Sequence, residues 1–271
     1  MSKKKRDIPL YKTPIIETHF HLDMLKTNPA EEIVAKSLQQ NIEKMITIST
    51  SPENLDVVVD ISLKYPSIFC TQGVHPHDGK EWQESVRASI VENLNNPLKR
   101  ARIVAIGEIG LDYYYNKSIR EEQLTAFEEQ MQIAIDFDLP VVVHTRDADE
   151  DTIAVLKNFS SHLIRKGVVH SFTSSLELAQ FALNENFYLG FNGIITFKNA
   201  DNVRDALRIT PLNRILLETD SPFLTPDPYR GVENAPYYLP FIAEKIAEIK
   251  NVEVDLVLSE AYQNSIDLFH F

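Results

Sequence analysis

The sequence has only one cysteine, Cys70, among its 271 residues. A single cysteine cannot form an internal disulfide, and Cys70 ends the apolar run Ile68-Phe69-Cys70, so we predict a small buried side chain and a reducing, cytosolic compartment. No stretch approaches the roughly 20 apolar residues of a membrane-spanning helix. No hydrophobic signal segment follows the basic cluster Lys3-Lys4-Lys5-Arg6 either. We therefore expect no membrane association, and we interpret residues 1–12 as a flexible tail.

An excess of basic charge is also missing, because the formal net charge is −12. This acidity argues against a broad basic surface that grips nucleic acid through many phosphates. Bound divalent ions would invert the potential locally, so the charge does not exclude a nucleotide substrate. The 44% hydrophobic and 24% charged residues are typical of a globular protein with a sizeable core.

Strand-like and helix-like segments alternate without a long linker, a repeat or a low-complexity tract, which favours a parallel sheet wrapped by helices. We predict one domain over residues 1–271, a TIM-type (β/α)8 barrel with extra C-terminal helix, the last helix running from about Glu253. Before the fifth strand, Ser118 is expected to cap a helix with Glu121 three residues on, and Leu124 and Phe127 begin its buried face. The eight predicted strands begin near Ile15, Met45, Ile68, Ile103, Val141, Val168, Tyr188 and Ile215.

Six candidate metal ligands follow five of these predicted strands. An open doubly wound sheet would collect ligands at one switch point, whereas these residues follow strands one, four, five, six and eight. A closed barrel brings all those strand ends together. The candidates are His19, His21, Glu108, His144, His170 and Asp220.

His19 and His21 are two residues apart on an extended segment, so both side chains point to one face and can share an ion. Their alternative role is that of strand-end histidines that bond backbone carbonyls. Histidine nitrogen with carboxylate oxygen suits Zn²⁺, Mn²⁺ or iron, while Mg²⁺ prefers oxygen and water. Four histidines exceed the three protein ligands usual for a catalytic zinc, so two ions bridged by Glu108 divide the ligands better.

Two ions roughly 4 Å apart could hold a hydroxide at neutral pH and clamp the attacked and leaving oxygens of an ester. Asp220 could orient that water and accept its proton, so Glu108 and Asp220 are the predicted catalytic residues. The alternative for Asp220 is a helix N-cap in the turn Asp220-Ser221-Pro222.

Six motifs carry this pattern: residues 17–23 (ETHFHLD), 73–77 (GVHPH), 107–113 (GEIGLDY), 144–148 (HTRDA), 170–173 (HSFT) and 219–224 (TDSPFL). Together they resemble the TatD-type deoxyribonuclease family of metal-dependent hydrolases, within the amidohydrolase superfamily. The resemblance runs from Ile15 to Phe271. It implies that one ion binds His19, His21 and Asp220, that the other binds His144 and His170, and that Glu108 bridges the two.

Two positions depart from the family pattern. Glu17 replaces its usual Asp, and Ser171 replaces its usual Cys. Neither position is a direct ligand, so the departures affect only a supporting role of Glu17, whose extra methylene changes its reach.

Three further residues are candidates for binding substrate. Arg146 can fork onto two phosphate oxygens near the ions, although an ion pair with Asp147, Asp149 or another loop acid is the alternative. Arg230 follows the eighth strand, where barrels often bind phosphate. His75 could donate to a phosphate, whereas His77 is expected to stabilise its loop.

The segment after Glu108 carries two further features. Residues 113–115 are all tyrosine and could stack on a base or sugar, although packing against neighbouring loops is the favoured interpretation. Asp112 could hydrogen-bond a ligand histidine.

The leading hypothesis is a hydrolase with two divalent ions, Mg²⁺, Mn²⁺ or Zn²⁺, that cleaves phosphodiesters at DNA ends in the manner of a 3′-5′ exonuclease. The same ions polarise a carbonyl, so hydrolysis of a carboxylic ester or amide, such as a D-aminoacyl-tRNA, is the second hypothesis. A metal-dependent binding protein without turnover is the third. We expect a nucleic acid substrate and a monomer or weak homo-oligomer.

Overall fold

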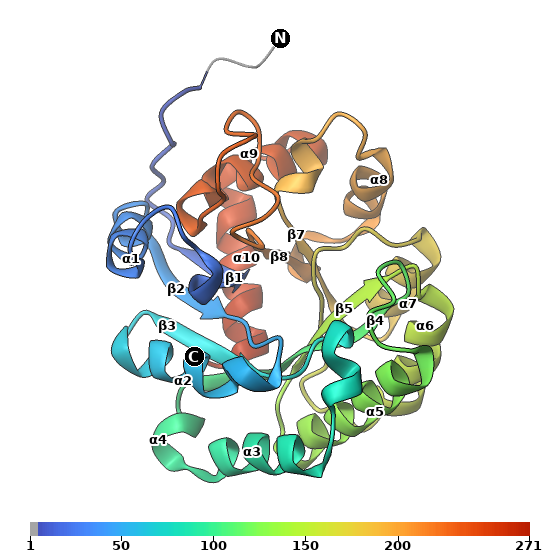
Figure 1. Cartoon of the computed structure of the whole chain (residues 1–271). Helices are drawn as coiled ribbons and strands as arrows, with labels where there is room; N and C mark the ends of the chain where they lie inside the picture. Colours follow the sequence, from blue (N-terminus) through green and yellow to red (C-terminus); the bar gives the residue numbers. More distant parts are fainter. Residues whose placement is uncertain (1–4) are drawn as a thin grey trace.

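The computed structural model describes residues 5–271, which contain one eight-stranded sheet with parallel neighbours in chain order (Figure 1). The predicted strand starts are confirmed within one residue, except that β2 begins at Ile42 instead of near Met45. The strands are β1 (Ile15–Phe20), β2 (Ile42–Thr47), β3 (Ile68–Gln72), β4 (Ile103–Asp112), β5 (Val141–Arg146), β6 (Gly167–Val169), β7 (Tyr188–Phe191) and β8 (Ile215–Leu217).

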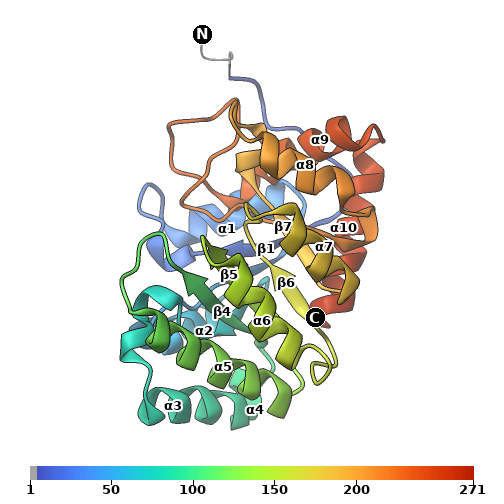
Figure 2. The same ribbon diagram turned by 90° about the vertical axis from the view of Figure 1, so that its right-hand side faces the viewer.

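Helices cover the outside of this sheet, and two of them follow the last strand (Figures 1 and 2). The predicted TIM-type barrel with added C-terminal helix is confirmed. The helices are α1 (Ala30–Gln39), α2 (Leu55–Lys64), α3 (Glu84–Asn95), α4 (Pro97–Arg100), α5 (Arg120–Asp136), α6 (Asp149–Phe159), α7 (Leu176–Asn184), α8 (Asp201–Ile209), α9 (Leu239–Lys250) and α10 (Val254–Phe269).

Alternation along the strands separates two hydrophobic clusters. On β2, Met45 belongs to the large cluster shared with the helices, whereas the next residue, Ile46, belongs to a second cluster. Successive strand side chains point to opposite faces, so the second cluster fills the inside of the barrel. Leu268 and Phe269, at the end of α10, join this inner cluster. The last helix therefore helps to fill the barrel.

The barrel is nearly closed, because the sheet order runs from β1 to β8 and, within residues 5–271, the only β-bridge between its two ends is the isolated one of Phe20 with Ser221. Helix α10 packs against both β1 and β8. The buried Asn264 of α10 donates from Nδ2 to the carbonyl oxygens of Leu212 and Ile215, at 2.8 and 2.9 Å. The added helix thus fastens the start of β8 at the seam.

The expected cap of α5 is wrong. The helix begins at Arg120, and the Ile119 N–H before it donates to the Glu122 carboxylate at 3.0 Å. Ser118 instead donates from its hydroxyl to the His77 carbonyl at 2.9 Å. A buried serine can form hydrogen bonds with the backbone of a neighbouring loop as readily as with the first turn of a helix. The local sequence does not distinguish these two roles.

The N-terminal segment and the cysteine each have defined surroundings. Of the expected tail, residues 1–4 lie outside the described residues, whereas Arg6 pairs with Glu244 of α9 and the Tyr11 hydroxyl donates to that carboxylate at 3.1 Å. Cys70 is fully buried, as predicted, and burial raises its thiol pKa to about 12. No helix within residues 5–271 combines the length and apolar character that crossing a membrane requires.

Phe127 of α5 is fully buried in the large cluster and tests the predicted face of this helix. We expect Phe127→Ala to lower the free energy of unfolding by about 3–5 kcal/mol, because it removes apolar contacts and leaves a cavity. Val57→Ala, at a position that is 42% exposed on α2, should stay within about 0.5 kcal/mol of wild type. Urea titration measures both, and a Phe127→Ala value as small as the control would contradict this packing.

Candidate metal centre

The segment after β8 is joined to β1 by backbone hydrogen bonds. The Asp220 N–H donates to the His19 carbonyl at 2.9 Å, and the His21 N–H donates to the Ser221 carbonyl at 2.8 Å. Glu17 supports the same joint, because its Oε1 accepts the N–H groups of His19 and Thr219, each at 3.0 Å. The side chain that departs from the family pattern therefore holds together two segments that carry predicted ligands.

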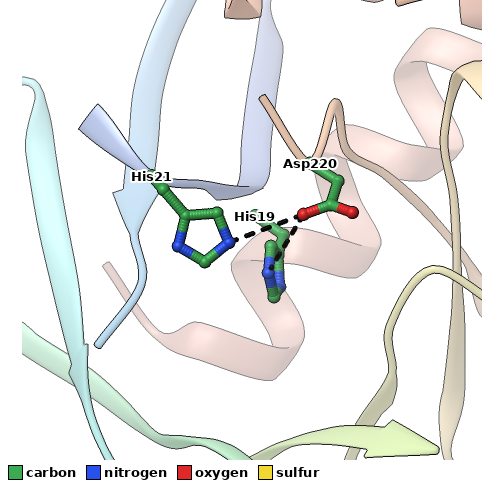
Figure 3. Close-up of side chains that lie close together, drawn as sticks. All are labelled: His19, His21 and Asp220. Carbon is green, nitrogen blue, oxygen red and sulfur yellow. Dashed lines mark ion pairs between the residues drawn. The ribbon is translucent and has the colours of Figure 1, made fainter. Parts of the chain in front are cut away.

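This joint places His19, His21 and Asp220 around one point (Figure 3). Asp220 Oδ1 lies 3.5 Å from His21 Nε2 and 3.8 Å from His19 Nε2. The Asp220 backbone has a φ of 55°, and within residues 5–271 no helix begins there. Asp220 is therefore not a helix N-cap. The geometry matches the first set of predicted ligands.

Glu108 lies inside β4, not at its end as expected, because the strand continues to Asp112. Its register with β5 shifts between Ile106 and Ile109, and such irregularities re-aim side chains next to active sites. Glu108 Oε1 lies 2.7 Å from His170 Nε2 and 2.9 Å from His144 Nδ1.

The other oxygen of this carboxylate lies near a different histidine. Glu108 Oε2 lies 3.4 Å from His19 Nε2. One buried carboxylate therefore faces His19 with one oxygen and the pair His144 and His170 with the other, so the structure brings all six predicted ligands together.

Asp112 contacts the ring nitrogen of His144 that does not face Glu108. Its Nε2 lies 3.1 Å from Asp112 Oδ2, which also lies 3.0 Å from His77 Nε2. Asp112 thus has the contact that we expected for it, and such a carboxylate fixes the orientation of a ligating imidazole. Gly110 pairs with His144 in the adjacent strand, and a Cβ at this position would lie 2.0 Å from the His144 carbonyl oxygen. Only glycine allows β4 and β5 to approach this closely.

Burial and neighbouring charges give the histidines different protonation states. Burial lowers the pKa of His19 to about 4, aided by His170. Burial would also lower the pKa of His144, but its hydrogen bonds to Asp112 and Glu108 outweigh this effect and raise the pKa to about 9. Burial opposes ionisation of Glu108, yet the charges of His170 and His75 and its hydrogen bonds hold its pKa well below the usual range. Glu108 is therefore a carboxylate at neutral pH.

The donor set fits divalent ions. Both ring nitrogens of His19 and the Nδ1 atoms of His21 and His170 are buried without a hydrogen-bond partner among the described residues. Burying polar nitrogens without a partner is unfavourable, and a cation is the partner that imidazole nitrogens and carboxylates share. Mixed nitrogen and oxygen ligands suit Zn²⁺, Mn²⁺ or iron.

The sequence interpretation missed Glu218 and the contact of His75 with Glu108. Glu218 is fully buried, groups with His19 and His170, and accepts the Ser171 N–H through Oε1 at 2.5 Å. His75 Nε2 lies 3.4 Å from Glu108 Oε1, so this residue groups with Glu108 and His144. Glu218 directly follows β8, and this position after a buried strand could have marked it as a further candidate ligand.

The two arginines with predicted substrate roles lie on aromatic rings. The Arg146 guanidinium is 4.0 Å from the Tyr114 ring centroid and 4.8 Å from that of Tyr115. Asp149 and Asp151 bond Ser175 and Arg120 instead, so the alternative ion pair of Arg146 is not observed with either. Arg230 lies 3.5 Å from the Phe197 ring centroid and is exposed.

An open cleft of about 790 Å³ lies beside this cluster. Most of its lining comes from the end of β5 and from the segments that follow β4, β5 and β6, and Asn202 of α8 completes it. The lining residues are Tyr113, Arg120, Arg146, Asp147, Ala148, Asp149, Glu150, Asp151, Thr173, Ser174, Ser175 and Asn202.

A parallel barrel that gathers histidines and carboxylates at its strand ends is typical of metal-dependent hydrolases. The family model for TatD related DNase matches residues 16–270. An uncharacterized metal-dependent hydrolase of Buchnera aphidicola is 39% identical over 248 residues, which are 89% of this chain and 93% of that protein.

Two further relatives carry the TatD name. The 3′-5′ ssDNA/RNA exonuclease TatD of Salmonella typhimurium is 32% identical over 223 residues, covering 80% of this chain and 84% of that protein. The crystal structure of the TatD homologue YjjV from Escherichia coli K12 has a TM-score of 0.88 and 29% identity, with 95% of this chain and 98% of that chain covered. The chain therefore belongs to the TatD related DNase family and is a metal-dependent hydrolase.

The raised pKa of His144 predicts how ion binding depends on pH. Below pH 9 the metal-free imidazole is protonated, so an ion that binds to His144 would displace that proton. The affinity for Mn²⁺ should therefore rise with pH up to about 9, and His144 alone contributes about tenfold per pH unit.

Calorimetry in buffers of different ionisation enthalpy measures the released proton. In His144→Ala the slope of log affinity against pH should fall by about one, whereas His162→Ala, which removes an exposed histidine outside the cluster, should keep the wild-type slope. An unchanged slope in His144→Ala would show that this residue does not exchange its proton for the ion.

Proposed function

We propose that this hydrolase uses two divalent ions to cleave phosphodiesters at the ends of DNA, in the 3′-5′ direction. The observation that carries the proposal is the buried Glu108 carboxylate, whose two oxygens face different histidine groups. On this proposal His19, His21 and Asp220 hold one ion, His144 and His170 hold the other, and Glu108 bridges them. Bound Mg²⁺, Mn²⁺ or Zn²⁺ would supply Lewis-acid activation of water and of the attacked ester.

The protein groups around the cluster suit their proposed roles. Burial opposes ionisation of Asp220, but its contact with His21 and the nearby His19 outweigh burial and lower its pKa. The Asp220 side chain is 15% exposed, so a carboxylate that can accept a proton from water borders solvent. Water that loses this proton attacks phosphorus, the bond from phosphorus to the leaving sugar oxygen breaks, and that oxygen takes up a proton.

Arg146 is the proposed phosphate-binding residue. Its guanidinium lies over the Tyr114 ring and near the Tyr115 ring and makes no ion pair within residues 5–271, so its N–H groups are available to fork onto phosphate oxygens. His75 and Arg230 are assigned smaller roles in substrate binding. The His75 ring lies beside the Glu108 carboxylate, near where the attacked phosphate would bind. The TatD exonuclease of Salmonella typhimurium, named for single-stranded DNA and RNA, supports the nucleic acid class of substrate.

A second candidate function, hydrolysis of an aminoacyl ester, is favoured by the acids of the open cleft. Asp147, Asp149, Glu150 and Asp151 line it beside Arg146. Carboxylates there would attract the cationic α-amino group of an aminoacyl ester, a group that a DNA end lacks. Turnover of an aminoacyl-tRNA together with no cleavage of DNA or RNA would favour this second function.

Asp220→Asn separates catalysis from ion binding. We expect metal-dependent shortening of end-labelled single-stranded DNA to fall at least about 100-fold, because the amide cannot accept a proton from water. Metal analysis should still find ions bound, since the histidines and Glu108 remain. Asp60→Asn, an exposed carboxylate on α2, is the matched control and should keep full activity.

Two results would contradict the proposal. Shortening by Asp220→Asn at the wild-type rate would remove Asp220 from the reaction. Ions bound to wild type without turnover of phosphodiesters or acyl esters would favour a binding protein.

A further inference from the structure

We infer that Tyr114 and Arg146 form a stacking site for the nucleobase next to the cleaved phosphodiester, an inference that rests on the proposed function. Tyr114 is 57% exposed and Tyr115 is 53% exposed. The preceding residue, Tyr113, instead packs against the main hydrophobic cluster and donates its hydroxyl to Asp151 at 2.5 Å. Of the three tyrosines, Tyr113 therefore packs into the fold, whereas the rings of Tyr114 and Tyr115 are exposed to solvent.

The two exposed rings are held in a fixed arrangement. Tyr114 and Tyr115 meet edge to face, with centroids 4.9 Å apart and planes at 89°. Tyr115 also meets the His77 ring edge to face at 5.3 Å, and its N–H donates to Asp112 Oδ1 at 2.8 Å. A preorganised aromatic surface loses little conformational entropy when a flat ligand binds to it.

This surface is connected directly to the metal centre. Asp112 accepts the Tyr115 N–H with one oxygen and contacts His144 Nε2 with the other, at 3.1 Å. In the register of β4 and β5, Asp112 is also the backbone partner of Arg146, two residues beyond the partners Gly110 and His144. The stacking surface and a proposed metal ligand therefore share one carboxylate, so a base on the rings would belong to a nucleotide at the reacting phosphate.

The charges around the rings favour a nucleotide over a neutral aromatic ligand. Arg146 covers Tyr114, and the Lys117 ammonium lies 5.9 Å from the Tyr115 centroid. Neither cation forms an ion pair with a carboxylate anywhere in residues 5–271. Unpaired cations next to exposed rings, on a chain of net charge −12, match the phosphate and the base of one nucleotide. Stacking is tolerant of base identity, so we expect little sequence preference.

The test combines removal of the ring with removal of the base. Two proteins are compared in the presence of Mn²⁺: the Asp220→Asn variant, which prevents cleavage, and the double variant that also carries Tyr114→Ala. Each is titrated with short single strands that end either in a base or in an abasic sugar. Fluorescence anisotropy of a label at the far end gives each affinity. A series is run for each end of the strand.

Loss of the Tyr114 ring should weaken binding of the strand with a terminal base about tenfold. The same loss should change binding of the abasic strand less than about twofold, because there is no base to stack. Tyr114→Phe keeps the ring and should bind as wild type does. Equal weakening of both strands, or no weakening of either, would overturn the stacking site.

Cleavage by the otherwise wild-type chain is measured separately, so the two proposals can fail independently. Base-dependent weakening without cleavage of any strand would support the stacking site and contradict the phosphodiesterase. Cleavage without base-dependent weakening would support the phosphodiesterase and contradict the stacking site. Thermal unfolding of Tyr114→Ala, expected at the wild-type temperature because the ring is exposed, shows that the fold is retained.

Discussion

The site depends on how the two ends of the sheet meet. In the described chain only an isolated bridge joins β1 to the segment after β8, so a regular strand ladder does not position His19 and His21 beside Asp220. The Asp220 N–H bond to the His19 carbonyl and the buried carboxylate of Glu17 do so instead. A joint of single hydrogen bonds can place a side chain where a continuous ladder, which fixes every residue in register, would not.

The second constraint is the number of ionisable groups buried behind this joint. Burial raises the pKa of Glu17 to about 8, and burial together with the charge of Asp220 raises that of Glu218 well above its usual range. Glu108 stays ionised only because histidines surround it. Buried carboxylates and unpartnered imidazoles are unfavourable in an apolar barrel, and divalent cations would offset that cost. The residues that make the barrel interior less stable are the same ones that can bind ions.

The sequence predicts the scaffold, and it predicts that the candidate ligands lie close together, because both follow one pattern. Buried parallel strands require β-branched runs, and functional residues follow such runs at one end of a barrel, so strand starts and ligand positions emerge together. The sequence does not predict contacts that depend on register or loop path. The irregularity in β4 aims Glu108 inward from within the strand, and His75 reaches it from the next loop. Ser118 carries the signature of a helix cap but bonds another loop.

The same division separates reaction from specificity. The cluster of buried histidines and carboxylates can activate water against phosphorus or against a carbonyl, so it does not select between the two esters. We expect substrate selection to fall to the segments after β4 and β5, where Arg146 lies on exposed tyrosines and shares the lining of the cleft with several carboxylates. A phosphate with its base would suit the arginine and the tyrosines, and a cationic amino group would suit the carboxylates. Exposed side chains can change with little effect on stability, so substrates can diverge on these two loops while the buried cluster stays the same.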